Sequence, residues 1–441
     1  MSPSAAVTVP STPLLDATEL EAALCRALRC EPSALQSLHC GGQKEGGSAE
    51  GFTSKCGSMT VDAVVRGRAH KLHLFVKRAD IKDMADGMDS FGREALFYLT
   101  VLPLLERSWR RRDIPGEPLR PDLGPAGYLG TDSVMVMEDL TRLGYRAADN
   151  WVQKGFDFST VQQALRALAR LHAAALLAQR LDGVDLAAAA PDLLKEHFFT
   201  RRPGTVGRRL FDCAADIVCD VLLPRLQPRL KVPQTKQELQ RMRDLTRDLY
   251  PNLDMDKLRA EDASKVLVVS HGDAWPNNVL YKFDEQGRAE HAVMIDFQQA
   301  RLAPPALDVA MYLHISSRQS FRDQHMDSLL RGYHDDLTRF TMERGLDMTK
   351  DYSWEVFLAS MKQVTPLARA IAISYQHINS GNPDDMEAFF QDSEARERML
   401  MESEARAVPV ARWFDAEERY RQIMQEYVED LLQLPRAEAA A

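Results

Sequence analysis

The chain has 441 residues, a formal net charge of −9, and 45% hydrophobic and 27% charged residues. This length suits two domains or one large unit of two lobes, and the composition is that of a globular protein. The negative charge argues against a nucleic-acid-binding protein held by phosphate contacts. The sequence contains no run of 18 apolar residues, so it predicts no membrane-spanning helix. The six scattered cysteines form no CxxC pair and the start has no secretory signal, so we expect a cytoplasmic protein.

The first part of the chain has the hydrophobic patterns of a lobe rich in β-strands. Gly, Pro and Ser clusters separate short alternating apolar runs, which is typical of strands and turns. The expected elements are a flexible tail over 1–16, a helix over 17–30, a loop over 40–58, strands over 59–67 and 70–79 around a turn near Gly67, a helix over 90–106 and a strand over 130–140.

After about residue 145 the pattern becomes helical, beginning with a strongly periodic segment over 159–181. Further helical patterns cover 205–230, 234–262, 320–346, 353–378 and 385–434. The single β-like island of this part is 266–297. The sequence therefore predicts an α+β fold with a tail over 1–16, a β-rich lobe over 17–140 and a helical lobe over 141–441. A ligand cleft between the two lobes would be a natural site.

Three polar residues fall within the β-like island, among apolar neighbours. Asp273 ends an HGD triplet, Asn278 begins the first strand of an expected hairpin, and Asp296 ends its second strand. Because a hairpin places its two ends side by side, we expect these oxygen ligands to converge. The D-x-x-x-x-N spacing followed by a second Asp is typical of phosphoryl transfer with Mg²⁺. The alternative is that all three are turn residues, but an unpaired carboxylate inside the apolar run around Asp296 is costly.

A lysine and a glutamate in the first lobe could complete such a site. Lys77 ends the alternating strand "LHLFVKRA", and Glu94 follows 17 residues later on the expected helix "FGREALFYL". Kinases hold phosphates with a strand lysine that pairs with a helix glutamate. The alternatives are a solvated strand end for Lys77 and a solvated helix face for Glu94, for which Glu106 competes as the partner.

At these residues the sequence resembles the ecdysteroid kinase-like family, within the aminoglycoside phosphotransferase and choline kinase group. The matching stretches lie between about residues 50 and 320, and HGD-x-W-x-N-N followed by IDFQ is the most specific pair. In chain order they are "LFVKRA", "FGREALFY", "VMVMEDL", "LARLHAAAL", "SHGDAWPNNVLY", "MIDFQ" and "PPALDVAMYL". The last 120 residues contain no motif that matches.

The resemblance implies a protein-kinase-like fold of two lobes, with a nucleotide-binding lobe first and a catalytic and substrate lobe second. It also implies roles for eight residues. They are Asp273 as catalytic base, Asn278 and Asp296 as Mg²⁺ ligands, Lys77 with its partner Glu94 at the ATP phosphates, Glu138 and Leu140 as hinge contacts to adenine, and Ser54 near phosphate in the Gly/Ser-rich loop. The role of Ser54 competes with that of a plain flexible loop.

The function implied is ATP- and Mg²⁺-dependent phosphorylation of a hydroxyl on a small molecule, such as an ecdysteroid, another steroid-like alcohol or a xenobiotic. One alternative is a catalytically silent pseudokinase that binds a nucleotide or metabolite. Another is a protein kinase, but the sequence lacks a G-x-G-x-x-G-x-V loop and an A-P-E segment. We expect a small-molecule alcohol as partner, with no nucleic acid and no membrane. The sequence does not determine the oligomeric state.

Several other residues have plainer interpretations. His172 lies on an apolar helix face, which predicts a core histidine. His271 is expected to brace the HGD turn, and Asp308 to brace that turn or cap the following helix. Four aromatic residues could line an acceptor pocket but are more typical of a core. They are Phe198, Phe199, Phe357 and Tyr375.

Overall fold

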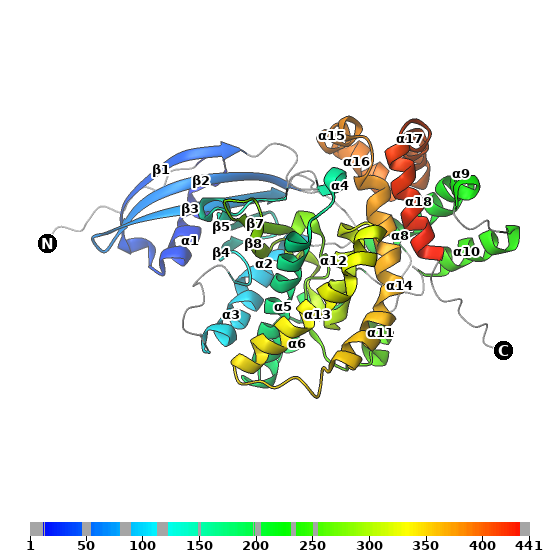
Figure 1. The fold of residues 1–441 in the computed structure, drawn as a ribbon. Coiled ribbons are helices and arrows are strands. Elements are labelled where there is room, and N and C mark those ends of the chain that lie inside the picture. The colour runs from blue at the N-terminus through cyan, green and yellow to red at the C-terminus, as the bar shows by residue number, and fades with distance from the viewer. Residues whose placement is uncertain are drawn as a thin grey trace.

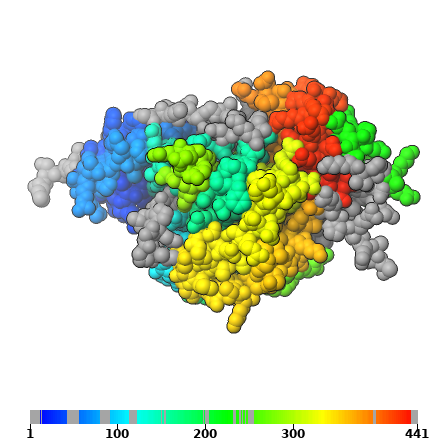
Figure 2. All heavy atoms as spheres, viewed as in Figure 1, coloured from blue at the N-terminus to red at the C-terminus, as the bar shows by residue number. Residues whose placement is uncertain are grey.

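The computed structural model describes most of the chain in two parts, an antiparallel sheet with three helices and a larger helical part (Figure 1). The predicted α+β fold with a β-rich first lobe and an α-rich second lobe is confirmed. In Figure 2 the sheet region lies at one end of the molecule and the C-terminal helices lie toward the other. The described residues are 12, 14–45, 54–79, 90–112, 122–148, 151–196, 198, 204–230, 235–249 and 255–432.

The first lobe is built on a five-stranded antiparallel sheet with the order β1-β2-β3-β5-β4. Strands β2 and β3 pair over their whole length around the turn at Gly67, as predicted. The elements are α1 (Ala17–Leu28), η1 (Pro32–Ala34), β1 (Leu35–Glu45), β2 (Ser54–Val65), β3 (Arg68–Ala79), α2 (Ser90–Leu96), η2 (Phe97–Val101), α3 (Leu102–Arg110), β4 (Gly127–Gly130), β5 (Val134–Glu138) and η3 (Leu140–Leu143).

Helix α1 covers one face of this sheet. Its N-terminus has a capping box in which Asp16 and Glu19 each accept from the other's backbone N–H. Leu20 and Leu24 are fully buried in a cluster that includes alternate residues of β2 and β3. Leu15 is also buried there, so the last residues of the predicted tail are packed, while 1–11 and 13 lie outside the described residues. Because side chains alternate along β3, Lys77 lies on the face opposite α1.

The segment 40–58, predicted to be a loop, is partly strand, and that prediction was wrong at both of its ends. β1 continues to Glu45 and β2 begins at Ser54, with Lys44 paired to Ser58. Gly and Ser have a low strand preference, but cross-strand pairing supplies the hydrogen bonds that stabilise the strands here. A register shift between Gly41 and Lys44 marks an irregularity of the kind that glycine favours. Residues 46–53 lie outside the described residues.

Strand β4 packs so closely on α2 that only glycine fits at its end. A Cβ added to Gly130 would lie 2.4 Å from the Cβ of Ala95. We therefore expect Gly130→Ala to lower the free energy of unfolding by about 1–3 kcal/mol, the usual cost of overpacking. Urea unfolding measures this loss, with Gly41→Ala as control because a Cβ at Gly41 meets only His39, at 3.7 Å. Equal urea midpoints for the two variants would contradict the close packing.

The second lobe is mostly helical, and its predicted β-like island forms β6, β7 and β8. The short strand β9, which pairs with β6, was not predicted. The elements are α4 (Trp151–Lys154), α5 (Phe158–Arg180), α6 (Leu186–Ala189), α7 (Pro191–Leu194), α8 (Val206–Asp216), η4 (Ile217–Leu222), α9 (Leu223–Leu226), η5 (Gln227–Arg229), α10 (Lys236–Leu249), α11 (Met255–Glu261), β6 (Val268–Ser270), η6 (Pro276–Asn278), β7 (Val279–Phe283), β8 (Ala289–Met294), η7 (Phe297–Gln299), β9 (Arg301–Ala303), α12 (Pro305–Ser316), α13 (Gln319–Glu343), α14 (Trp354–Asn379), α15 (Pro383–Gln391), α16 (Ser393–Met401), α17 (Ser403–Ala416) and α18 (Glu418–Leu432).

Helices α5, α12 and α14 form the centre of this lobe and carry residues that reach the site. The main hydrophobic core includes most buried residues of α5, α12 and α14 and continues into α2 and α3 of the first lobe. Among the described helices, α14 alone is long and apolar enough to cross a membrane by length and composition. In the fold, 56% of its most apolar window is buried inside the protein, as in a core helix.

Candidate active site

The HGD triplet forms a tight turn directly after β6. Gly272 has a φ of 76°, in the left-handed region that favours glycine. A Cβ at this position would lie 2.1 Å from the carbonyl oxygen of Gln299, so any side chain would collide with the backbone. The turn therefore requires glycine, and it places Asp273 at the end of a buried strand.

Asp308, near the start of α12, stabilises the HGD turn through hydrogen bonds to its carboxylate. Its carboxylate accepts hydrogen bonds from Ser270 Oγ at 2.7 Å and from the backbone N–H groups of His271 at 2.6 Å and Gly272 at 3.0 Å. His172 Nε2 lies 3.1 Å away on α5. Burial alone would raise the pKa of Asp308, but the bonds from His172 and Ser270 lower it to about 2. Asp308 thus braces the turn, and His172 is a buried core histidine, as predicted.

His271 joins the turn to the end of β8. Its Nε2 lies 2.8 Å from the carbonyl oxygen of Ile295, and its Nδ1 lies 3.3 Å from the backbone N–H of Asp273. A carbonyl only accepts, so Nε2 donates and Nδ1 accepts from Asp273. His271 therefore braces the turn, as predicted.

Asp273 is nearly buried, at 9% exposure, and both of its carboxylate oxygens are engaged. Asn278 Nδ2 donates to Oδ2 at 2.9 Å and to the backbone carbonyl of Asp273 at 2.9 Å. The hydroxyl of Tyr375 donates to Oδ1. Burial raises the pKa of Asp273 above its ordinary value, although the bonds from Tyr375 and Asn278 and the nearby His271 oppose this. A raised pKa suits a group that must accept a proton.

Asp296 follows β8 in a left-handed conformation, with a φ of 64°. Positive φ is uncommon for a non-glycine residue and often marks a functional position. Its backbone N–H donates to Tyr98 Oη at 3.1 Å, and the next residue, Phe297, stacks on Phe97 with ring centroids 3.8 Å apart. These contacts with η2 fix Asp296 against the first lobe. Its side chain is 27% exposed, so it is open to a ligand.

Lys77 and Glu94 form a buried ion pair between β3 and α2. Lys77 Nζ lies 2.7 Å from Glu94 Oε2 and 3.4 Å from Asp296 Oδ1. Burial alone would lower the pKa of Lys77, but Asp296 and Glu94 raise it, so the ammonium stays charged. Burial raises the pKa of Glu94 to about 7, against the opposing effect of Lys77. The predicted pair is therefore present, and it joins the two lobes through Asp296.

Two of these residues have the oxygen ligands that Mg²⁺ prefers. Asn278 uses its amide nitrogen on Asp273, which leaves its carbonyl oxygen as the atom suited to a cation. Asp296 supplies a partly exposed carboxylate. Among the described residues, no group of three or more His, Cys, Asp or Glu could hold a metal. The donor set fits Mg²⁺, which binds through one or two protein carboxylates plus phosphates and waters.

With this geometry in view, the comparisons with known proteins identify the family. The model of the ecdysteroid kinase-like family matches residues 48–345, well over half of the chain. The chain belongs to the ecdysteroid kinase-like family. No curated protein matches the chain.

Two solved structures resemble this member of the ecdysteroid kinase-like family at low identity. The streptomycin–ATP–APH(2″)-IIa ternary complex has 13% identity and a TM-score of 0.34, with 83% of this chain and 93% of that chain covered. The microcompartment-associated aminopropanol kinase has 12% identity and a TM-score of 0.37, with 79% and 91% covered.

The remaining predicted nucleotide contacts lie at the ends of strands or just after them. Glu138 ends β5 and donates its backbone N–H to the carbonyl of Ala126 at 2.9 Å. Leu140 is 3% exposed and begins η3. Ser54 is the first residue of β2, and its side chain lies outside the described part of the structure. The roles of Glu138, Leu140 and Ser54 in this family member stay predictions.

Sequence reasoning did not predict the contacts that two tyrosines make in the site. Tyr375 was assigned to the core or to an acceptor pocket, yet it contacts Asp273 itself, and Tyr98 on η2 accepts from Asp296. Tyr98 ends the stretch "FGREALFY" and Tyr375 lies in no motif, but both contacts join segments far apart in the chain, so local sequence gave no signal for either contact. Phe357 is a buried core residue, as expected, and Phe198 packs partly buried against the core. Phe199 lies outside the described residues.

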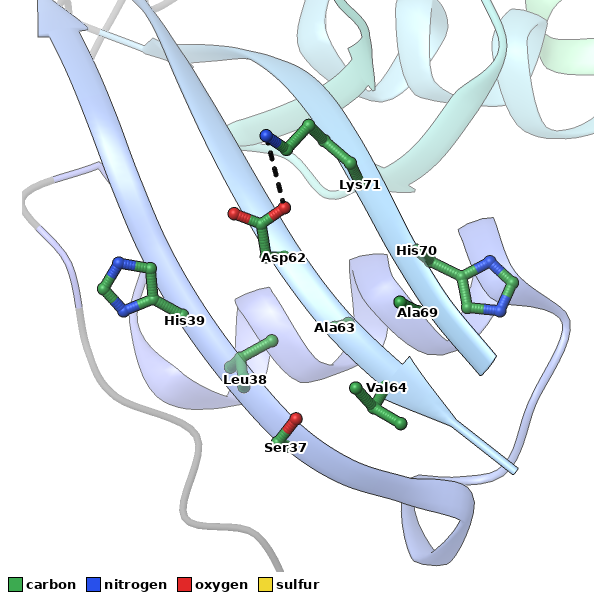
Figure 3. A pocket seen from close by; sticks show the side chains of 9 residues that line it. All are labelled: Ser37, Leu38, His39, Asp62, Ala63, Val64, Ala69, His70 and Lys71. Atoms are coloured by element: carbon green, nitrogen blue, oxygen red, sulfur yellow. Dashed lines mark ion pairs between the residues drawn. The ribbon is translucent and has the colours of Figure 1, made fainter. Parts of the chain in front are cut away.

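A separate hollow of about 310 Å³ lies on strands β1, β2 and β3 of the sheet (Figure 3), and its lining includes no residue of the site around Asp273. Its lining includes Lys71, which pairs with Asp62 at 3.6 Å and lies on the same strand face as Lys77. Figure 3 shows the side chains of Asp62 and Lys71 pointing away from α1. The hollow is shallow and mostly lined by exposed residues, so it is distinct from the site around Asp273. The lining residues are Ser37, Leu38, His39, Asp62, Ala63, Val64, Ala69, His70 and Lys71.

Proposed function

We propose that the protein is an ATP- and Mg²⁺-dependent kinase that transfers the γ-phosphoryl group of ATP to a hydroxyl of a small molecule. The observation that carries the proposal is a continuous set of contacts. Asn278 bonds Asp273, and the backbone carbonyl of Asn278 accepts from Ile295, the residue before Asp296. Asp296 in turn lies 3.4 Å from Lys77 of the Lys77–Glu94 pair. Residues from both lobes contribute, so the parts of a phosphoryl-transfer site come together in one place. Membership of the ecdysteroid kinase-like family supports the same activity.

In this mechanism Asp273 acts on the acceptor. Its Oδ1 would hydrogen-bond the acceptor hydroxyl, orient the oxygen toward the γ-phosphorus and accept the proton as the new P–O bond forms. Asn278 holds the carboxylate in one orientation, because its Nδ2 donates both to Oδ2 and to the backbone carbonyl of Asp273. Since the turn is braced by Asp308 and His271, Asp273 needs little reorganisation before transfer.

Lys77 acts on the phosphates. Its ammonium is oriented by Glu94 at 2.7 Å, and the direction of its pKa shift keeps it charged. A fixed positive charge stabilises the negative charge that develops on phosphoryl oxygens. Asn278 and Asp296 would hold Mg²⁺, which when bound neutralises phosphate charge.

The rest of the proposal concerns the binding of nucleotide and acceptor. Residues 17–140 would form the nucleotide-binding lobe, with the backbone of Glu138 and Leu140 meeting adenine and Ser54 near the phosphates. Residues 141–441 would form the catalytic and substrate lobe. The family points to a small-molecule alcohol as acceptor, with an ecdysteroid, another steroid-like alcohol or a xenobiotic as the classes to examine.

The test is transfer of labelled γ-phosphate from Mg·ATP to a fractionated small-molecule extract and to a panel of hydroxylated steroids. We expect a labelled product with the wild-type protein and none with Asp273→Asn. The mass of the product identifies the acceptor. ATP binding without any labelled product, in any fraction, would instead favour a silent pseudokinase that binds a nucleotide or metabolite.

A further inference from the structure

Tyr375 reaches the predicted catalytic base from a distant part of the chain. It lies near the C-terminal end of α14, 102 residues after Asp273, and its hydroxyl donates to Asp273 Oδ1. The ring meets Trp275 edge to face, with centroids 5.3 Å apart and planes at 78°. The phenol is half-buried, unlike its helix neighbours Ser374 and Gln376, which are buried. A single polar atom of α14 is thus placed directly on the reacting carboxylate.

The hydroxyl of Tyr375 occupies the place beside Asp273 Oδ1 where the hydroxyl of a phosphate acceptor would have to bind. Asn278 already holds Asp273 Oδ2, so Oδ1 is the oxygen left to accept the proton of an incoming hydroxyl. Tyr375 donates to that same oxygen. The phenol therefore imitates an acceptor: a hydroxyl on an apolar ring, bonded to the base. Water cannot occupy the same point while the phenol is there.

The backbone of α14 is fixed at this point, so any displacement must be a rotation of the Tyr375 side chain. Gln376 Nε2 donates to the carbonyl of Ile315 on α12 at 2.7 Å. The carbonyl of His377 accepts from the hydroxyl of Tyr420 on α18 at 2.6 Å. These bonds tie the helix to α12 and to α18 just after Tyr375, while Tyr375 itself is only partly buried.

We propose that Tyr375 is a specificity-determining residue that closes the acceptor position of Asp273 against water and yields only to an alcohol that replaces its hydrogen bond. The proposal rests on the kinase function proposed above. An acceptor that also presents apolar surface to Trp275 would replace the ring contact as well, so alcohols on an apolar frame are favoured over water. Tyr375 acts through Asp273 and is a positioning residue, with no bond to phosphate required of it.

The test uses water as the acceptor, so that no substrate needs to be known. In hydrolysis a water oxygen forms a bond to the γ-phosphorus, the bond from that phosphorus to the ADP oxygen breaks, and the water proton passes to Asp273. Tyr375→Phe removes one oxygen atom beside Oδ1 and keeps the ring, which leaves space for a water. We expect ATP hydrolysis to rise on the order of tenfold, because a hydrogen bond to a charged group is worth a factor of that order. The dissociation constant for Mg·ATP should stay unchanged.

Two further variants distinguish the proposed exclusion of water by Tyr375, called the gate below, from a general structural effect on α14. Tyr420→Phe also removes a buried phenol bond to α14 but does not touch Asp273, so its hydrolysis rate should equal that of the wild type. In Asp273→Asn/Tyr375→Phe the rise should disappear, because the water no longer has its base. An equal rise in Tyr420→Phe would mean that loosening of α14 is the cause, and the gate would be wrong.

The outcomes also distinguish this proposal from the kinase function. If the protein binds Mg·ATP and transfers phosphate but Tyr375→Phe hydrolyses ATP no faster than the wild type, the gate is wrong and the kinase stands. Phosphate found on the Tyr375 hydroxyl itself would equally overturn the gate, since the phenol would then be an acceptor. If neither the wild type nor Tyr375→Phe binds Mg·ATP, the kinase function fails and the gate falls with it.

Discussion

Asp273→Asn should reduce phosphoryl transfer by roughly 10²- to 10⁴-fold, the usual contribution of a general base. Asn has the same shape as Asp but cannot accept the acceptor's proton. Its single carbonyl oxygen can satisfy either Asn278 or Tyr375, whereas the carboxylate satisfies both. The variant should still fold, because the bonds from Asp308 that brace the turn go to other residues.

The measurement is the rate of γ-phosphate transfer together with the dissociation constant for Mg·ATP by calorimetry. Binding should change little, since in the proposed mechanism Asp273 acts on the acceptor and other groups hold the phosphates. Asp327→Asn, an exposed carboxylate on α13, is the matched control and should leave both values unchanged. A rate for Asp273→Asn within about threefold of the wild type would rule out Asp273 as the base, since a base contributes far more.

The part of the site that could be predicted from sequence is the part that the local chain builds. Asp273, Asn278 and Asp296 lie within one short stretch, and its apolar runs and turn define the hairpin of β7 and β8 without knowledge of any other element. Lys77 and Glu94 lie 17 residues apart on neighbouring elements, so a strand and a helix were enough to suggest their pairing. The roles of these residues stay predictions.

The part that could not be predicted depends on contacts between distant segments. Tyr375 reaches Asp273 only because α14 packs on α12, and its own surroundings are a plain apolar helix pattern. Tyr98 meets Asp296 across 198 residues. β1 was missed because its Gly-rich end has a low strand preference, which the pairing with β2 overrides.

Lys77→Met should strongly reduce turnover and also destabilise the protein, and the two effects have separate causes. Loss of a charge that stabilises transferring phosphate costs about 10²–10³ in turnover. Loss of one partner of a buried ion pair costs about 3–5 kcal/mol, because the Glu94 carboxyl is left buried beside Asp296 without its cation. Lys71→Met is the matched control on the same strand, where both partners are more than half exposed, so little of either quantity should change.

The double variant Lys77→Met/Glu94→Gln tests this division. It removes the unpaired Glu94 carboxyl, so stability should recover most of its loss while turnover stays low.

The pH dependence of stability gives a second readout. The raised pKa of Glu94, about 7 against an ordinary value near 4.5, means that the folded state keeps a proton which the unfolded state releases, so stability falls as the pH rises through that window.

Without the ammonium of Lys77 the pKa of Glu94 should rise further, since only burial and the neighbouring Asp296 then act on it. The stability deficit of Lys77→Met relative to the wild type should therefore grow from pH 6 to pH 8. The stability of the double variant should lose the pH dependence that comes from Glu94. Urea unfolding at both pH values measures this. A deficit that is independent of pH would show that the cost of removing Lys77 comes from lost packing of its aliphatic stem, and the ion pair would then contribute to catalysis alone.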